Sequence, residues 1–174
     1  MILSWKAPIY YNEKLIGSYA AEHGSYETVG SNFDYLSLLV GKPYPAGMDK
    51  PEVFFSCSKR KVLDYDCLWL LGDIPLVSPR LADFLVQSAG LDVELLTPKS
   101  ITADGEDIGE IYYIMNAVEA IRAIDHSKSV AELSEEGSIL YFNEIWLHDN
   151  AVGMRAIARE YDSGDLLISQ ELAD

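Results

Sequence analysis

The sequence predicts an α+β fold: a mixed or largely antiparallel sheet with few helices packed on it. Short segments rich in aromatic or β-branched residues outnumber the segments with helical periodicity. The clearest helix has a recognisable cap residue at each end. The chain has 174 residues, 49% of them apolar, so it can bury a core of its own and forms one domain or at most two.

Residues 1–60 give few structural signals, and we assign them no function. Residues 32–41 suit a helix or a strand equally. Residues 41–51 contain three prolines and two glycines, a composition typical of a linker or of an ordered surface loop. We therefore treat 1–60 as an N-terminal region packed on a main α+β domain, 61–174.

The clearest helix is predicted over Ser78–Ala89. The Ser78 hydroxyl can cap the free N–H groups of the first turn, and Pro79 suits the first helical position because it has no N–H to satisfy. Gly90 can take the left-handed conformation that ends many helices. This pattern predicts one short amphipathic helix. The residues expected on its packed face are Leu81, Phe84, Leu85 and Ser88.

Strands are predicted where aromatic or β-branched residues gather between Gly, Asp, Asn or Ser. Residues 103–109 are predicted as a turn or loop, and residues 127–137 as a loop that holds one helical turn. The basic run Lys59-Arg60-Lys61 is expected in a solvated turn or beside an edge strand. The predicted strands are 53–57, 67–71, 92–96, 111–117, 138–147 and 165–169.

Residues 76–83 and 167–174 repeat one pattern, LVSPRLAD against LISQELAD. Both copies predict a strand, a serine cap and a helix start, with Ser78 as the first cap and Ser169 as the second. Either an internal duplication or convergence on one capping solution explains the repeat. So short a second helix is expected either to fray or to dock on another element.

The chain is strongly acidic, with 28 Asp and Glu against 13 Lys and Arg and a net charge of −15. Residues 1–100 contain 12 acids and 9 bases, whereas residues 101–174 contain 16 acids and 4 bases, so most of the net charge lies in the second part. Such a surface repels nucleic acid and anionic membranes, which excludes both as direct partners. Basic proteins and cations stay open as partners.

The sequence predicts a cytoplasmic protein. Its first residues lack the apolar stretch of a signal peptide, and its richest apolar run, 67–77, is too short and too interrupted to span a membrane. Cys57 and Cys67 lie ten residues apart without a metal-binding spacing, so we expect them to be buried thiols in a reducing compartment.

The order of several short motifs along residues 65–174 resembles one bacterial family. The motifs are IPLVSPRLADFL (74–85), GLDVELLTP (90–98), YYIMN (112–116), AIDHSKS (123–129), LYFNEIW (140–146) and LLISQEL (166–172). Their succession is similar to immunity family eleven of the bacterial polymorphic toxin systems, formerly described only as a domain of unknown function. The resemblance says little about residues 1–60.

This resemblance implies a non-catalytic immunity protein that stays in the cytoplasm of the producing bacterium and binds and neutralises a cognate protein toxin. Many such toxins are nucleases with basic grooves, and an acidic inhibitor is steered toward such a groove. It implies no cofactor and no metal, and it leaves the oligomeric state open. We expect Asp125 and Ser129 to close a loop onto backbone N–H groups. The motif residues with expected structural roles are Ser78, Pro79, Arg80, Asn116, Asp125 and Ser129.

Carboxylates crowd the predicted loop around residue 106. Their spacing does not match a calcium-binding EF-hand, because the fifth and twelfth positions counted from Asp104 are Ile108 and Met115. We therefore expect them to face a partner, together with a second acidic group further along the chain. The predicted partner-binding residues are Asp104, Glu106, Asp107, Glu110, Glu132, Glu135 and Glu136.

The alternative function is a small enzyme or a ligand-binding domain with a carboxylate-lined pocket. The sequence contains no nucleotide-binding or serine-hydrolase motif, and His23, His126 and His148 lack metal-ligand spacing. The run Asp125-His126-Ser127 holds triad residue types side by side, which predicts a turn and not a catalytic triad. The aromatic residues open to two interpretations, interface anchor or core, are Tyr10, Tyr11, Tyr19 and Trp146.

Overall fold

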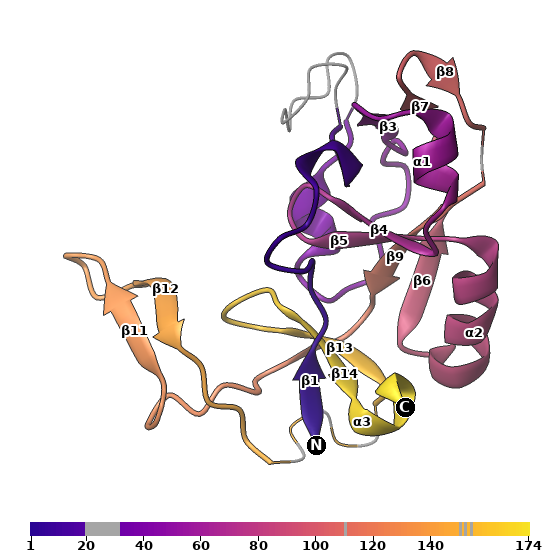
Figure 1. Ribbon diagram of the computed structural model, residues 1–174. Helices are drawn as coiled ribbons and strands as arrows, with labels where there is room; N and C mark the ends of the chain where they lie inside the picture. The colour runs from indigo at the N-terminus through magenta and orange to yellow at the C-terminus, as the bar shows by residue number, and fades with distance from the viewer. Residues whose placement is uncertain (20–31, 110, 150, 152, 154) are drawn as a thin grey trace.

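The computed structural model describes residues 1–19, 32–109, 111–149, 151, 153 and 155–174. Within these residues the chain forms fourteen strands, three α-helices and two 3-10 helices, and the strands make four sheets (Figure 1). Seven of the ten strand pairs are antiparallel and three are parallel. The α+β class predicted from the sequence is confirmed. None of the helices in this part of the chain is long and apolar enough to cross a membrane.

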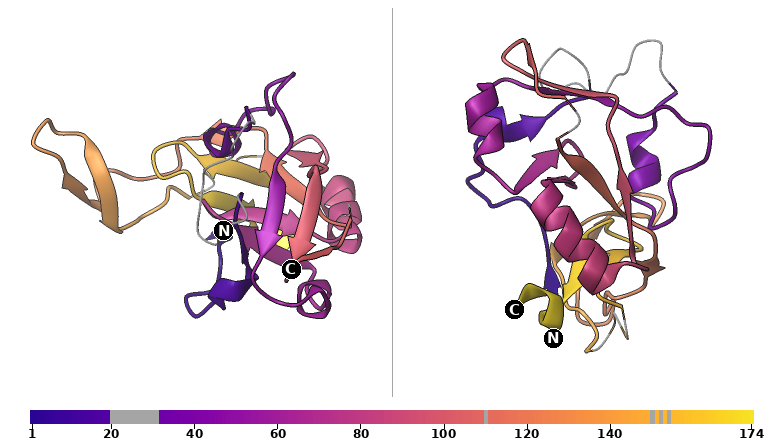
Figure 2. Two further views of the ribbon diagram at one scale, coloured as in Figure 1. Left: turned by 90° about the horizontal axis from the view of Figure 1, so that it is seen from above. Right: turned by 90° about the vertical axis from the view of Figure 1, so that its right-hand side faces the viewer.

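A five-stranded sheet forms the centre of the body. Helix α2 (Pro79–Ala89) connects two of its strands and packs on one side of the sheet (Figures 1 and 2). Its strand order is β2 (Ile16–Gly17), β4 (Cys67–Leu70), β5 (Ile74–Val77), β9 (Tyr113–Ala117) and β6 (Val93–Leu96).

A three-stranded sheet lies next to it, in the order β3 (Glu52–Phe55), β7 (Ser100–Ala103) and β8 (Glu106–Asp107). Helix α1 (Lys59–Leu63) follows β3 and contacts β7. Two short 3-10 helices, η1 (Glu13–Leu15) and η2 (Tyr35–Leu38), complete this part of the body.

A four-stranded sheet joins the first and last strands of the chain. Its order is β1 (Ile2–Ser4), β14 (Leu166–Ser169), β13 (Ile157–Glu160) and β10 (Ala120–Ile121). Ser169 caps α3 (Gln170–Ala173), and the Gln170 N–H donates to the Met1 carbonyl at 3.1 Å. The short second helix therefore docks on β1 and does not fray.

Two clusters of buried apolar side chains hold these three sheets together. The first includes Val53, Leu68 and Ile101, and so joins the five-stranded sheet to the three-stranded one. It contains side chains from residues 1–60 as well as from the rest of the chain, so both regions share one core. The second cluster lies under α2 and includes Leu85 and Ile157, which joins the five-stranded sheet to the four-stranded one.

The fourth sheet is a hairpin of two strands, β11 (Val130–Leu133) and β12 (Ile139–Glu144). We call residues 129–147, which include this hairpin and its base, the arm. Figures 1 and 2 show that the arm projects away from the body. An isolated bridge between Ile124 and Leu147 closes its base.

Several predicted elements match the structure. The Ser78 hydroxyl accepts a hydrogen bond from the Leu81 N–H at 3.3 Å, and Pro79 occupies the first turn of α2. Residues 41–51 form an ordered loop and not a linker, since Tyr44 is buried in the first core cluster. The six predicted strand segments each overlap a strand: β3, β4, β6, β9, β12 and β14.

Several local predictions are wrong. Of the residues expected on the packed face of α2, Phe84 and Ser88 are exposed, because the side of the helix that packs on the sheet carries Ala82, Leu85 and Ala89. Gly90 has φ −55° and is not left-handed; it is needed because a Cβ there would lie 2.5 Å from the Val86 carbonyl oxygen. Residues 127–137 contain strand β11 and no helical turn, because the pairing with β12 decides their conformation. The run Lys59-Arg60-Lys61 begins helix α1, which Ser58 caps.

Candidate functional site

The predicted partner-binding carboxylates lie on two separate hairpins. Asp104, Glu106 and Asp107 belong to the β7–β8 hairpin, residues 100–109, at the top of Figure 1. Three more are in the arm: Glu132 lies on β11, and Glu135 and Glu136 lie in the turn at its tip. Glu110 lies outside the described residues. The carboxylates therefore do not form one continuous patch.

The β7–β8 hairpin is part of the body. Its apolar residues Ile101, Ala103 and Ile108 are all buried in the first core cluster. At its other side, the Lys59 ammonium donates to the Asp107 carbonyl at 3.2 Å, while the Asp107 carboxylate accepts from the Gly109 N–H at 2.8 Å. This hairpin thus exposes carboxylates beside a cation and exposes no large apolar side chain.

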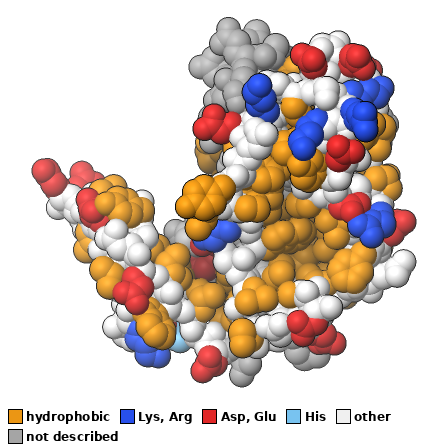
Figure 3. Space-filling model, viewed as in Figure 1, with side chains coloured by type: hydrophobic (Ala, Val, Ile, Leu, Met, Phe, Trp, Pro, Cys, Tyr) orange, Lys and Arg blue, Asp and Glu red, His pale blue; other side chains and the backbone are white. Residues whose placement is uncertain are grey.

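The arm has the opposite composition on its surface. It contains four glutamates and no Lys, Arg or His between residues 129 and 147. Figure 3 shows its acidic and hydrophobic side chains together, clear of the body. Seven large apolar side chains of the arm are exposed: Val130, Leu133, Ile139, Leu140, Tyr141, Ile145 and Trp146.

The pairing of β11 with β12 sorts these side chains onto two faces. Residues directly opposite each other share a face, and successive residues of β11 alternate between faces. The register shifts twice along the hairpin, which places one extra β12 residue, Leu140 or Asn143, at each shift. One face holds Val130, Glu132, Tyr141 and Glu144, and the other holds Ala131, Leu133, Ile139 and Phe142.

On the first face, each aromatic side chain is hydrogen-bonded to a carboxylate. The Tyr141 hydroxyl donates to the Glu132 carboxylate, and this bond raises the pKa of Tyr141. The Trp146 indole N–H donates to Glu144 Oε1 at 2.8 Å, which places Trp146 beside Glu144. Tyr141 is 52% exposed and Trp146 is 51% exposed. We call these four residues the aromatic–acidic face.

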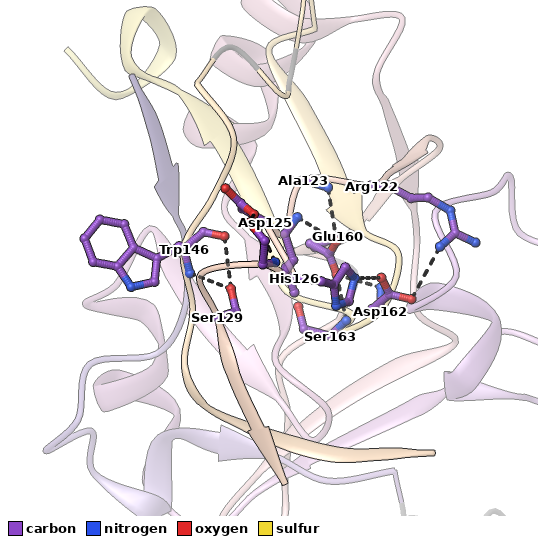
Figure 4. A network of polar contacts seen from close by, with 11 residues as sticks. Arg122, Ala123, Asp125, His126, Ser129, Trp146, Glu160, Asp162 and Ser163 are labelled. Atoms are coloured by element: carbon purple, nitrogen blue, oxygen red, sulfur yellow. Dashed lines mark hydrogen bonds and ion pairs between the residues drawn. The ribbon is translucent and has the colours of Figure 1, made fainter. Parts of the chain in front are cut away.

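Asp125 and Ser129 fix the backbone of Trp146. The Ser129 hydroxyl accepts from the Trp146 N–H at 2.9 Å, and the Asp125 N–H donates to the Trp146 carbonyl at 2.7 Å. The Asp125 carboxylate accepts from the Ser127 N–H at 3.1 Å. These contacts are the local loop closure that the sequence predicts for Asp125 and Ser129. Figure 4 shows that the indole of Trp146 points away from the network that holds its backbone.

Neighbouring groups keep the Asp125 carboxylate ionised. The Ser127 hydroxyl donates to it at 2.6 Å, and the Lys128 ammonium lies 3.0 Å from it. Together they lower the pKa of Asp125 to about 2. The run Asp125-His126-Ser127 is a turn, as predicted, and this carboxylate closes it.

Glu160 joins the base of the arm to the β13–β14 turn. Its buried carboxylate accepts from the N–H groups of Ala123 at 3.1 Å and Ile124 at 3.4 Å. It also accepts hydrogen bonds from the backbone N–H groups of Asp162 at 2.6 Å and Ser163 at 2.7 Å. Sequence reasoning missed Glu160, because two of its four partners, Ala123 and Ile124, lie more than thirty residues away and nothing local marks that contact.

Asp162 adds a second connection across the same junction. It lies 2.9 Å from the His126 ring and 3.8 Å from the Arg122 guanidinium (Figure 4). That guanidinium also stacks over the Tyr161 ring, 4.0 Å from its centroid. Arg122 therefore sits between an aromatic ring and a carboxylate.

The remaining motif residues make contacts within the fold. Arg80 forms an ion pair with Asp66, and the Ser78 hydroxyl donates to the same carboxylate at 2.7 Å, so the pKa of Asp66 falls to about 2. The buried Asn116 amide donates to the Lys42 carbonyl at 2.8 Å and to Glu94 at 3.0 Å. Asn116 thereby holds the 41–51 loop on the sheet.

The other sequence candidates are spread over the molecule. His126 and His148 are exposed and His23 lies outside the described residues, within which no three His, Cys, Asp or Glu side chains gather as a metal site would require. Cys57 and Cys67 are free thiols but only partly buried, not fully buried as predicted; this burial raises the pKa of Cys57, and that of Cys67 to about 12. Tyr19 is buried, Tyr11 is partly buried and Tyr10 is exposed.

A hollow of about 410 Å³ lies between Met1 and His148, and one of about 470 Å³ lies beside α1. Two carboxylates, Asp64 and Glu106, line the second hollow together with Lys59 and Arg60. Charges of both signs mix there, so it is not the carboxylate-lined pocket that the alternative function needs.

Comparison with protein-family models and with curated protein sequences gives no match. The resemblance to the immunity family accordingly stays a prediction from the motifs.

Proposed function

We propose that this chain is a non-catalytic immunity protein that binds and neutralises a cognate protein toxin in the cytoplasm of the producing bacterium. The observation that carries the proposal is the surface of the arm, with seven exposed large apolar side chains, four glutamates and no basic residue. Contiguous exposed apolar surface bordered by polar groups is typical of protein–protein interaction sites.

The arm also lacks the support that a stable sheet needs. A two-stranded hairpin is marginally stable by itself, and the arm has neither a third strand nor a covering helix among the described elements. Its apolar side chains gain burial only when another molecule covers them. A protein partner supplies that cover and leaves the core of the body unchanged.

The carboxylates of the site favour binding over acid–base chemistry. A general acid at neutral pH needs a raised pKa, whereas the pKa of Asp125, at the base of the arm, is lowered to about 2. The buried carboxylate of Glu160 is occupied by four backbone N–H groups. Asp125 and Glu160 thus stabilise the fold at the base of the arm.

We infer that the partner is a toxin from the resemblance to the immunity family and from the negative charge of the chain. An acidic surface attracts a basic one and raises the association rate more reliably than the final affinity. A nuclease toxin offers a basic groove of this kind. The acidic, apolar arm fits a groove that is basic at its rim and apolar at its centre.

Co-expression with the protein encoded by the neighbouring gene tests the proposal. We expect a complex that survives purification and that abolishes the toxicity of the neighbouring protein in cells. The control is a variant whose arm is replaced by a short glycine–serine turn between residues 128 and 148, which should fold but lose the complex. A neighbouring protein that is neither toxic nor bound would contradict the proposal.

A further inference from the structure

We infer that the aromatic–acidic face of the arm is a binding surface for arginine side chains of a protein partner. Each pair, Tyr141 with Glu132 and Trp146 with Glu144, combines a half-exposed ring with an exposed carboxylate held next to it. The inference rests on the proposed function and names the chemistry that the partner must present.

Arginine matches both parts of such a pair. Its planar guanidinium stacks on an aromatic face and forms parallel hydrogen bonds to a carboxylate. Each carboxylate accepts one hydrogen bond from the N–H or O–H of its aromatic partner. Its remaining lone pairs can accept hydrogen bonds from the guanidinium. A lysine ammonium is a compact, strongly hydrated charge that cannot stack in this way, so arginine is preferred.

A related arrangement of an arginine with an aromatic ring and a carboxylate occurs within this molecule. The Arg122 guanidinium stacks 4.0 Å above the Tyr161 ring and lies 3.8 Å from the Asp162 carboxylate. The arm presents the ring and the carboxylate of this arrangement twice, without the arginine. No cation of the arm itself can fill either position, because residues 129–147 contain none.

The rings are positioned before a partner arrives. Ser129 and Asp125 fix the Trp146 backbone, and Glu144 fixes its indole, so little side-chain freedom remains to be lost on binding. Tyr and Trp in such half-buried, rigid positions are the residue types that dominate binding energy at interfaces.

Charge favours another protein over a second copy of this chain. Two copies each have a net charge of −15, and two arms would bring eight glutamates together. The chain's one run of three cations, Lys59-Arg60-Lys61, is partly used, since Lys59 contacts Asp107 and Lys61 lies over the Tyr65 ring. A foreign surface rich in arginine faces no such repulsion.

Titration of the isotope-labelled full chain with a short oligo-arginine peptide tests the inference directly. We expect the indole N–H resonance of Trp146 and the amides of 139–146 to shift, with oligo-lysine binding about fivefold more weakly. The indoles of Trp5 and Trp69, which lie together in the body, serve as internal controls. The β7–β8 hairpin is the acidic control without exposed aromatic rings.

Two substitutions at exposed positions sharpen the titration without touching the core. Trp146→Leu and Tyr141→Leu should each weaken oligo-arginine binding about fivefold, whereas Glu106→Gln in β8 should leave it unchanged. Equal shifts on both hairpins, or unaltered binding by the two leucine variants, would overturn the inference. Concentration-dependent shifts of the arm without any peptide would instead assign the face to a second copy.

The arginine-binding inference and the proposed function can each fail while the other holds. If the neighbouring gene's protein binds the wild-type chain and both leucine variants equally, the arginine surface is wrong and the immunity function stands. If the peptide binds the arm but the neighbouring protein forms no complex, the arginine surface stands and the immunity function is wrong.

Discussion

The two acidic hairpins of this molecule differ in what accompanies their carboxylates. In the β7–β8 hairpin the apolar side chains are buried in the core, and Lys59 lies against the exposed side. In the arm the apolar side chains are exposed and no cation is present. The apolar side chains of the β7–β8 hairpin are buried by the chain itself, whereas those of the arm can be buried only by another molecule.

This difference separates acidity from binding. Acidic residues at a surface serve solubility as well as recognition, so net charge alone does not locate an interface. Exposed aromatic rings next to carboxylates are a more specific feature, since they are costly to leave in water and are enriched where proteins bind. Of the two acidic hairpins, only the arm combines exposed aromatic rings with carboxylates.

The largest effect is expected when the junction that supports the arm is broken. Glu160→Gln replaces a carboxylate that accepts four backbone hydrogen bonds with an amide that can accept only at one end. We expect a loss of about 3 kcal/mol in the free energy of unfolding, measured by urea denaturation. Glu135→Gln at the exposed tip is the control and should cost less than about 0.5 kcal/mol.

Hydrogen exchange of the Glu160→Gln variant shows whether the loss of stability is confined to the arm. Amides at the base of the arm should exchange faster than in the wild type, while those of β7 should keep their protection because they belong to the core. Uniform acceleration over both hairpins would show that Glu160 supports the whole fold and not the arm in particular.

A smaller but more specific effect is expected at Trp146. Trp146→Ala should weaken the complex with the neighbouring gene's protein about thirtyfold, which corresponds to about 2 kcal/mol, without changing the free energy of unfolding by more than about 0.5 kcal/mol. The matched control is Phe84→Ala, since Phe84 is similarly exposed, at 47%, but lies on α2. Titration calorimetry that gives equal losses for both variants would remove the arm from the interface.

Charge reversal compares the two hairpins directly. Replacing Glu132, Glu135 and Glu136 by Lys should slow association with the partner about tenfold at low salt, because these charges surround the binding surface. The same reversal of Asp104, Glu106 and Asp107 should slow it less than about twofold. Stopped-flow rates at several salt concentrations measure both, and a larger effect from the β7–β8 variant would contradict the comparison.

The smallest expected effect is the pH dependence that Asp125 gives to the base of the arm. Its folded-state pKa is lowered to about 2, so its ionised form stabilises the fold above the unfolded-state pKa near 4. That stabilisation should be lost as the pH falls from about 4 toward about 2. Asp125→Asn should remove this part of the acid sensitivity, seen in unfolding curves at successive pH values, whereas the exposed Asp149→Asn should not.

Elements with local signals could be predicted from the sequence, and those that depend on distant pairing could not. Helix α2 was predictable because Ser78 and Pro79 mark its start within the helix itself. Strand β11 was not, because residues 127–137 are polar, lack alternation and become a strand only by pairing with β12. At Gly90 the sequence favours the left-handed conformation common at helix ends, whereas the close approach of Val86 explains why glycine is needed there.

The site shows the same division. Asp125 and Ser129 could be assigned a local role because their partners lie close in sequence or at the base of the same hairpin. The separation of the six described carboxylates onto two hairpins could not be foreseen, since it depends on which strands join the core. Trp146 was open to two interpretations until its exposure, 51%, decided between core and surface.

Hydrogen–deuterium exchange of the chain with and without the neighbouring gene's protein tests the central claim most directly. If the arm is the binding surface, residues 129–147 should gain protection in the complex while residues 100–109 stay as they are in the free chain. Protection of residues 100–109 with an unchanged arm would contradict the account.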